Sequence, residues 1–305
     1  MQAGPFQWLA FDTAVLERYL NDPRYRVEIY GFSGWISISD DFYDKVEERD
    51  SISIQGFGYA RNANQDPAIG VFTRYLSGLS PEHRHFWNSY QLQGDWFFHP
   101  HYESQMMEGT WDIKLSVYDA ILEEIAEINK ICDLLSKPHL FRETFEEGAR
   151  PRMFGFITRP TYRYYNEFVL LMDKLLSDNI DLKFFGNDVD RDETINRRNG
   201  QIQVRPKGSL HLLGEWLHKY YHGPNGENLA KDVLESLQLI RNERNNPAHR
   251  LDEDRFDRSL IDRHRKTIED VYNSLSTLRM IFASHPKAKA YQSPEHLVRE
   301  NVMHV

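Results

Sequence analysis

The spacing of apolar residues changes along the chain and predicts two kinds of structure. In the first third, short runs alternate apolar and polar positions with a period of two, as half-buried strands do. Residues 26–39, RVEIYGFSGWISIS, predict two strands joined by a turn at GFSG, and residues 51–61, SISIQGFGYAR, predict a third. Helices are expected at 12–20, at 68–78 and after Ser80–Pro81, where an N-cap serine precedes a first-turn proline.

From about residue 113, apolar residues recur with a period near 3.6, which predicts amphipathic helices. The stretch DIKLSVYDAILEEIAEINKICDLLSK reads as one long helix that Pro138 ends. Further helices are expected at 161–177, 208–222, 227–244 and 254–284. Residues 178–206 are mostly polar and are interpreted as a long loop. Helices in this number, with one insertion, favour a helical bundle.

These patterns predict an α+β N-terminal domain followed by an all-α C-terminal bundle of four to five helices, with the chain mostly α overall. The expected divisions are 1–112 for the α+β domain, 113–154 for the long helix and connector, 155–285 for the bundle and 286–305 for a tail. Charge supports two units. Residues 1–149 hold 12 Lys and Arg against 24 Asp and Glu, a net charge of −12, whereas the remainder holds 25 against 22, a net charge of +3. This asymmetry indicates two units with different partners.

The composition is that of a folded globular protein, with 40% hydrophobic and 27% charged residues. No apolar run approaches the roughly 18 residues needed to cross a bilayer. The N-terminus, MQAGPFQWLAFDTA, lacks the basic start and apolar stretch of a signal peptide. Cys132, the single cysteine, lies in an apolar helical pattern and cannot form an internal disulfide. We therefore expect a cytoplasmic protein with no membrane partner.

Residues 239–251, LIRNERNNPAHRL, concentrate positive charge and hydrogen-bond donors at the end of a predicted helix. Cations there interact favourably with the helix C-terminus, which explains most such arginines without any function. The chain must nevertheless bend, because Asn246 precedes Pro247 and so avoids helical geometry. On an ideal helix, Arg244 and His249 would lie roughly 140° apart. A break between them can bring both side chains to one side.

The sequence RNNPAH resembles the Arg-polar-x-x-x-His motif of the HEPN superfamily, helical bundles found in many prokaryotic toxin, antiviral and abortive-infection systems. Arg244 matches the arginine, Asn245 the polar residue and His249 the histidine. The resemblance covers roughly residues 155–285. It implies a metal-independent endoribonuclease that dimerises and pairs two motifs across one cleft. It equally allows a relative that keeps the fold and binds RNA, nucleotide or protein without cutting.

Metal-free RNA cleavage uses the adjacent 2′-hydroxyl as nucleophile and needs a base, an acid and a cation. His249 can move the protons, since its unperturbed pKa is near ~6.5. Arg244 can hold two phosphate oxygens with its planar guanidinium, and Asn245 can orient the histidine or the phosphate. One histidine does not easily act as acid and base at once, so a homodimer is expected to supply two. A purely structural polar corner is the alternative.

Further RNA contacts are expected from Arg241, Arg250, Arg197 and Arg198. The last two belong to the run NRRNGQIQVRPKG, for which a solvated loop is an equally good interpretation. The expected function is RNA cleavage in antiviral defence or toxicity, without metal or cofactor. The first domain would sense or restrain the second, and an antitoxin or a phage-derived trigger is a further partner that such systems allow.

Histidines offer an alternative, weaker hypothesis of a metal site. His83 and His85 form one pair, and His99 and His101 form another. Two His-x-His pairs on strands can bind zinc. The first pair, however, lies in a predicted helix, where residues i and i+2 face apart. His218 and His222 have chelating spacing on a helix, although an ordinary aromatic helix end explains them better.

Overall fold

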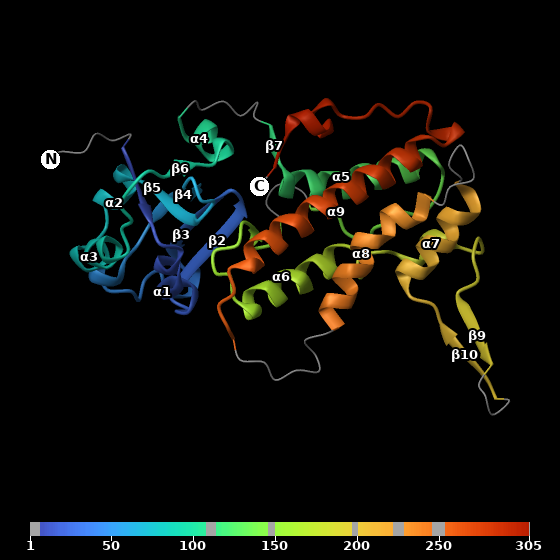
Figure 1. Cartoon of the computed structure of the whole chain (residues 1–305), viewed down its shortest axis with the longest axis horizontal. Coiled ribbons are helices and arrows are strands. Elements are labelled where there is room, and N and C mark those ends of the chain that lie inside the picture. Colours follow the sequence, from blue (N-terminus) through green and yellow to red (C-terminus); the bar gives the residue numbers. More distant parts are fainter. Residues whose placement is uncertain are drawn as a thin grey trace. The chain divides into compact units, whose positions relative to one another are not determined.

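The structure, a computed structural model, describes residues 7–107, 114–145, 150–196, 201–221, 229–245 and 254–304 (Figure 1). The chain divides into two compact units, and each is assembled from separate segments. Unit 1 contains Met1–Tyr118, Arg150–Pro160 and Glu300–Val305. Unit 2 contains Asp119–Ala149 and Thr161–Arg299.

A seven-stranded mixed sheet forms the centre of unit 1, in the order β1-β5-β4-β3-β2-β8, with β6 also paired to β4. Neighbouring strands are antiparallel except β8, which runs parallel to β2. The strands are β1 (Trp8–Phe11), β2 (Tyr25–Gly31), β3 (Ser33–Ile38), β4 (Ile54–Arg61), β5 (Pro67–Phe72), β6 (Phe97–Phe98) and β8 (Phe154–Gly155). A separate parallel pair joins β7 (Leu115–Ser116) to β11 (Val302–Met303).

The hairpin expected at 26–39 is present as β2 and β3, and Gly31 at their junction has a φ of 56°, which glycine adopts at little cost. Aromatic side chains pack closely on this sheet. A Cβ atom on Gly58 would lie 2.2 Å from the Tyr102 ring, and one on Gly70 would lie 1.9 Å from the Phe98 ring. These two glycines therefore allow the rings to lie directly on the strands.

Unit 1 also contains short helices: η1 (Thr13–Leu16), α1 (Glu17–Leu20), η2 (Asp40–Phe42), η3 (Glu48–Asp50), α2 (Thr73–Ser77), α3 (Pro81–Ser89), α4 (Pro100–Met107) and η8 (Arg299–Asn301, from Glu300 onward in this unit). Ser80 caps α3 as expected, because its hydroxyl accepts the His83 N–H at 3.3 Å. The helix expected at 68–78 is wrong for residues 68–72. That run is buried in β5 and pairs with strands on both sides, and short apolar runs do not distinguish strand from helix.

Unit 2 is mainly helical. Its helices are α5 (Val117–Leu134, from Asp119 onward in this unit), α6 (Tyr162–Leu175), η4 (Leu182–Phe185), α7 (Ser209–Tyr220), α8 (Leu229–Asn245), α9 (Ser259–Ala283), η6 (Pro286–Ala288) and η7 (Glu295–Leu297). Helix α8 packs against α6, α7 and α9 (Figure 1). A buried ion pair joins α9 to α5, with Arg279 Nε 2.6 Å from the Glu124 carboxylate.

The polar stretch 178–206 is not the long loop that its composition suggested. It contains η4 and an antiparallel hairpin of β9 (Asp192–Asn196) and β10 (Ile202–Pro206). Every residue of β10 is exposed, including Ile202 and Val204. Polar and β-branched residues alternate along parts of this hairpin, but the many charged residues around them make the stretch resemble a loop in composition.

The expected fold class is wrong. Helices occur in both units and are not confined to a C-terminal domain, and unit 2 contains a β hairpin. The seven-stranded sheet is completed by β8, which spans the predicted boundary between connector and bundle, and the predicted tail returns to unit 1 as β11. Pairing between segments distant in sequence produces this arrangement, and a local apolar period carries no information about such pairing.

No helix within the described residues combines the length and hydrophobicity that a membrane crossing requires.

Candidate functional site

The predicted motif begins at the C-terminal end of α8. This helix carries an apolar stripe that includes Val233, Leu237 and Ile240, all buried. Arg241 and Arg244 are three positions apart and therefore share a face. The helix ends at Asn245, which is exposed and is the last described residue before the Asn-Pro dipeptide.

Helix α6 presents a carboxylate to these arginines. The α6 sequence buries Tyr165, Val169 and Met172, and Asp173 lies on the same buried face with no exposed surface. After α6 ends, the Asp178 N–H donates to the Asp173 carbonyl at 3.0 Å, which turns the chain back. The Asp178 carboxylate therefore also reaches α8.

The two arginines and two aspartates form a compact ion-pair cluster. Arg244 Nη1 donates to Asp173 Oδ2 at 2.5 Å, and Arg241 Nη1 donates to the same oxygen at 2.6 Å. Asp178 accepts from Arg241 at 2.8 Å and lies 3.4 Å from Arg244. The other Asp173 oxygen, Oδ1, is buried without a hydrogen-bond partner among the described residues. Two positive charges thus share one fully buried carboxylate.

Electrostatics in the cluster favour charged arginines. Burial by itself lowers the pKa of Arg241, but its hydrogen bond to Asp178 and the charge of Asp173 outweigh this and raise the pKa above its ordinary value. Arg244 uses only Nη1 within the described part of the chain, and 35% of its side chain is exposed. Arg244 is therefore a cation that Asp173 holds from one side and whose side chain is partly exposed.

The structure brings together only part of the predicted site. Arg241, Arg244 and Asn245 lie on the last turns of α8. The predicted residues His249, Arg250, Arg197 and Arg198 lie outside the described residues. The convergence of Arg244 with His249 therefore stays a prediction. Arg241, predicted to contact RNA, engages Asp173 and Asp178.

Sequence reasoning missed both aspartates. The signal for Asp173 was present in the segment YNEFVLLMDKLLS, where a lone acidic residue lies on the buried stripe of an otherwise apolar helix face. A carboxylate at such a position is almost never left buried without a cation. Asp178, beyond the helix end and 40% exposed, gave no comparable signal.

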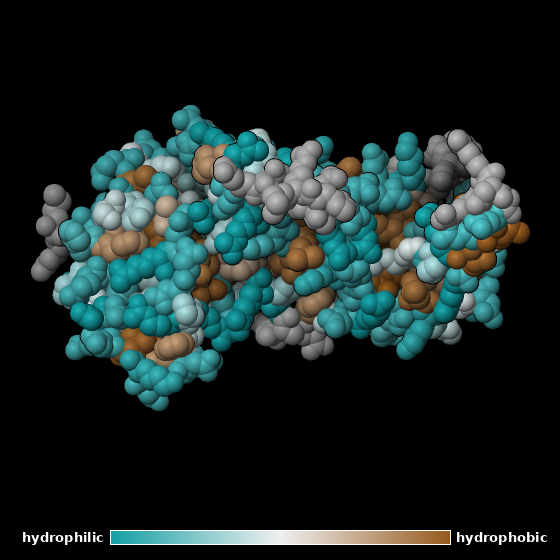
Figure 2. All heavy atoms as spheres, turned by 90° about the horizontal axis from the view of Figure 1, so that it is seen from below, coloured by the Kyte–Doolittle hydropathy of each residue, from teal (hydrophilic) through white to brown (hydrophobic). Residues whose placement is uncertain are grey.

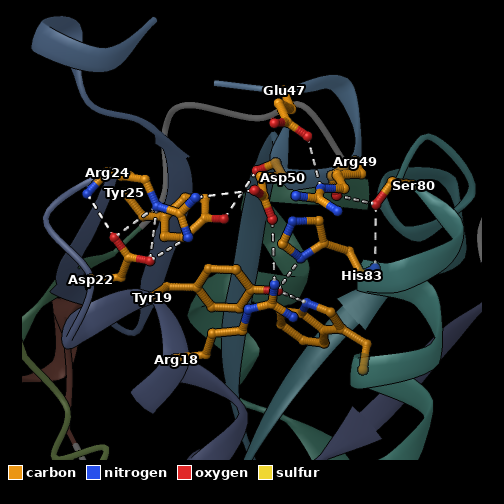
Figure 3. Close-up of polar contacts among 11 residues, drawn as sticks. Arg18, Tyr19, Asp22, Arg24, Tyr25, Glu47, Arg49, Asp50, Ser80 and His83 are labelled. Atoms are coloured by element: carbon orange, nitrogen blue, oxygen red, sulfur yellow. Dashed lines mark hydrogen bonds and ion pairs between the residues drawn. The ribbon is translucent and has the colours of Figure 1, made fainter. Parts of the chain in front are cut away.

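Three histidines of the alternative metal hypothesis, His83, His99 and His101, are buried in unit 1, whereas His218 lies on α7 in unit 2 and His222 lies outside the described residues. His83 is fully buried, and its Nδ1 lies 2.8 Å from the Tyr19 hydroxyl, which also accepts the Trp87 indole N–H at 2.9 Å (Figure 3). Burial lowers the pKa of His83. The Tyr19 hydroxyl thus links Trp87 and His83 in one chain of hydrogen bonds.

A charged network lies beside this chain. The Asp50 carboxylate accepts a hydrogen bond from Arg24 at 3.0 Å and lies 3.8 Å from Arg18 (Figure 3). Arg24 also donates to the Asp22 carboxylate through Nε and Nη2. The hydrogen bonds to Asp22 raise the pKa of the Arg24 guanidinium. Each of these arginines is paired with a carboxylate, as in an ordinary partly exposed ion-pair network.

His99 and His101 are also buried, and His99 stacks on Phe32 with ring centroids 3.5 Å apart while its Nε2 lies 3.0 Å from the His304 carbonyl oxygen. His85 is exposed on α3. No group of three or more His, Cys, Asp or Glu side chains suited to a metal ion occurs within the described residues.

Comparison with known proteins adds no relative: no known family matches this chain, and no curated protein or solved structure is significantly similar to it. The functional interpretation therefore depends on the geometry of the α8 end and on the motif itself.

Proposed function

We propose that unit 2 is a metal-independent endoribonuclease of the HEPN type, in which Arg244 binds the scissile phosphate and His249 transfers protons. The observation that supports this most is the anchoring of Arg244 by the buried Asp173, while 35% of the Arg244 side chain stays exposed at the end of α8. A planar cation held from behind by a carboxylate is preorganised for a developing negative charge. Antiviral defence or toxicity in the cytoplasm is the proposed setting.

The chemistry balances with these residues alone. The 2′-oxygen attacks the adjacent phosphorus, loses its proton to a base and forms a pentacoordinate phosphorane. The 5′-oxygen then leaves with a proton from an acid, and the product is a 2′,3′-cyclic phosphate. His249 of one subunit and the partner's His249 would act as base and acid, while Arg244 neutralises the phosphorane. Asn245, exposed beside Arg244, would orient the histidine or the phosphate.

The direct test is cleavage of single-stranded RNA by the full chain and its variants. We expect Arg244→Ala and His249→Ala each to reduce the rate ~100-fold to 10,000-fold, and Arg244→Lys to restore little because lysine lacks the planar fork. Arg163→Ala is the matched control, since Arg163 is an exposed arginine on α6 whose Nε lies 3.1 Å from the exposed Glu167 carboxylate. RNA substituted with 2′-deoxyribose at the cleaved position should resist. Equal rates in wild type and both alanine variants would refute the proposal.

One observation favours a second candidate, a non-cutting RNA or nucleotide binder with the same architecture. Asp173 and Asp178 already balance the charges of Arg241 and Arg244. Fluorescence anisotropy with labelled RNA separates the two functions. Salt-dependent binding that Arg244→Ala weakens, in a preparation that cuts no RNA, would support the binder.

A further inference from the structure

The two carboxylates that hold Arg241 and Arg244 differ in their access to water. Asp173 has no exposed surface, and its Oδ2 lies 2.5 Å from Arg244 Nη1 and 2.6 Å from Arg241 Nη1. It cannot leave these arginines without opening the helix packing around it. Asp178 follows the end of α6, its side chain is 40% exposed, and it lies 2.8 Å from Arg241 and 3.4 Å from Arg244. The cluster therefore combines one permanent carboxylate with one that water reaches.

The backbone of Asp178 is held in place although its carboxylate is partly exposed. Its N–H donates to the Asp173 carbonyl at 3.0 Å, and its carbonyl oxygen accepts from Arg142 Nη1 at 2.7 Å. Rotation about the side-chain bonds is then enough to separate the carboxylate from the arginines, and the chain itself need not move. The surface seen in Figure 2 is mostly hydrophilic, so a carboxylate that turns outward is hydrated and does not enter an apolar environment.

A pocket for another anion adjoins Arg241. It lies between α7 and α8 and has a volume of about 180 Å³, several times the ~30 Å³ that a water molecule takes up in the liquid. Its walls include Gln238, Arg241 and Asn242 of α8 and Ser209 and His211 of α7. None of the described residues that line it is acidic. A phosphate group that enters this pocket meets hydrogen-bond donors on its walls.

We propose that Asp178 competes with an RNA phosphate for Arg241 and Arg244, and that the phosphate displaces the Asp178 carboxylate when RNA binds. This inference rests on the proposed function, because it concerns the same arginines, and it adds a control on how tightly RNA is held. Without RNA, the Asp178 carboxylate takes the place of the anion and lowers the positive charge that the end of α8 presents. Asp173 stays in place and keeps Arg244 oriented during the exchange.

Asp178→Asn in the full chain tests this competition, with Glu167→Gln as the matched control. Glu167 is an exposed carboxylate on α6 that pairs with Arg163, so its replacement removes the same charge away from the cluster. Binding is measured by fluorescence anisotropy with a labelled single-stranded RNA that carries 2′-O-methyl groups, which block the nucleophile and prevent cleavage. We expect Asp178→Asn to lower the Kd about threefold to tenfold. Glu167→Gln should change the Kd by less than about twofold.

Three further measurements separate this competition from a general effect of charge. The slope of log Kd against log salt concentration should steepen by about 0.7 in Asp178→Asn, the value for one more phosphate contact on a single strand. In an Arg241→Gln background, the gain from Asp178→Asn should fall below about twofold, because the closer partner of Asp178 is gone. With cleavable RNA, the gain should appear as a lower KM at unchanged kcat, because substrate and transition state are bound more tightly by the same factor.

Unchanged or weaker RNA binding by Asp178→Asn with a native circular dichroism spectrum would overturn the competition, as would an equal gain in Glu167→Gln. RNA cleavage that depends on Arg244, without any gain in affinity from Asp178→Asn, would overturn the competition and leave the proposed function intact. Tighter binding by Asp178→Asn in a protein that cuts no RNA would instead remove the proposed function and keep the competition. Absence of RNA binding by wild type and Asp178→Asn at low salt would overturn both.

Discussion

Asp173 is the residue whose replacement most sharply tests the α8 cluster. Asp173→Asn keeps the shape of a fully buried side chain but removes the charge that two arginine nitrogens contact at 2.5 and 2.6 Å. Removing one partner from a buried ion pair typically costs about 3–5 kcal/mol. Here Arg241 and Arg244 are 31% and 35% exposed, and Asp178 still faces both, so hydration and the remaining carboxylate offset part of the cost. We expect a loss of about 2–3 kcal/mol.

Asp178→Asn is the matched control, because Asp178 contacts the same two arginines from a position that is 40% exposed. Its loss should be below about 1 kcal/mol. Urea unfolding followed by far-ultraviolet circular dichroism measures both, since the longest helices, α5, α8 and α9, lie in unit 2. Equal stability of Asp173→Asn and wild type, or an equal loss in both variants, would show that burial does not set the strength of this cluster.

Three further predictions concern the cores of the two units. Arg279→Ala should cost unit 2 about 3–5 kcal/mol in urea unfolding, because it leaves the α5 carboxylate buried and unpaired; a loss under 1 kcal/mol would contradict this. Burial lowers the pKa of His99 from 6.5 to about 4, so the unfolded chain binds the proton more readily and unit 1 should lose up to about 3 kcal/mol as the pH falls from 6.5 to 4. In His99→Gln, the melting temperature should change less between pH 6.5 and pH 4 than it does in the wild type. Gly70→Ala should cost about 1–3 kcal/mol, because the added Cβ clashes with a buried phenylalanine ring. Gly78→Ala is the control: a Cβ at this position would have no neighbouring side chain or strand within 4 Å, so the melting temperature should stay unchanged.

Local patterns predicted most of the α-helices in the described part of the chain, but only three of its strands, β2, β3 and β4. The periodicity of 208–222 and 254–284 corresponds to α7 and α9, and the Ser80–Pro81 pair starts α3 with the expected cap. These features depend on neighbours within a few residues, where side-chain spacing and capping act directly. The errors at 68–72 and 178–206 arose where a segment's state depends on the strand beside it.

The division into units depended on tertiary structure. Residues 154–155 pair with β2, and residues 302–303 pair with β7, so unit 1 takes strands from three separate parts of the chain. Two-residue strands have no periodicity to detect. β8 lies at the edge that β2 leaves open for hydrogen bonding, whereas β11 pairs with β7 outside the seven-stranded sheet.

At the candidate site, the sequence by itself determined that α8 carries positive charge in its last turns and ends near Arg244. The spacing of apolar residues predicts the helix, and the Asn246–Pro247 dipeptide predicts its end. Only the tertiary structure decided what holds Arg244. Its partner, Asp173, is 71 positions away on α6. Any of the chain's acidic residues could in principle pair with an arginine. The packing of α6 against α8 selects Asp173, because it places this buried carboxylate beside Arg244.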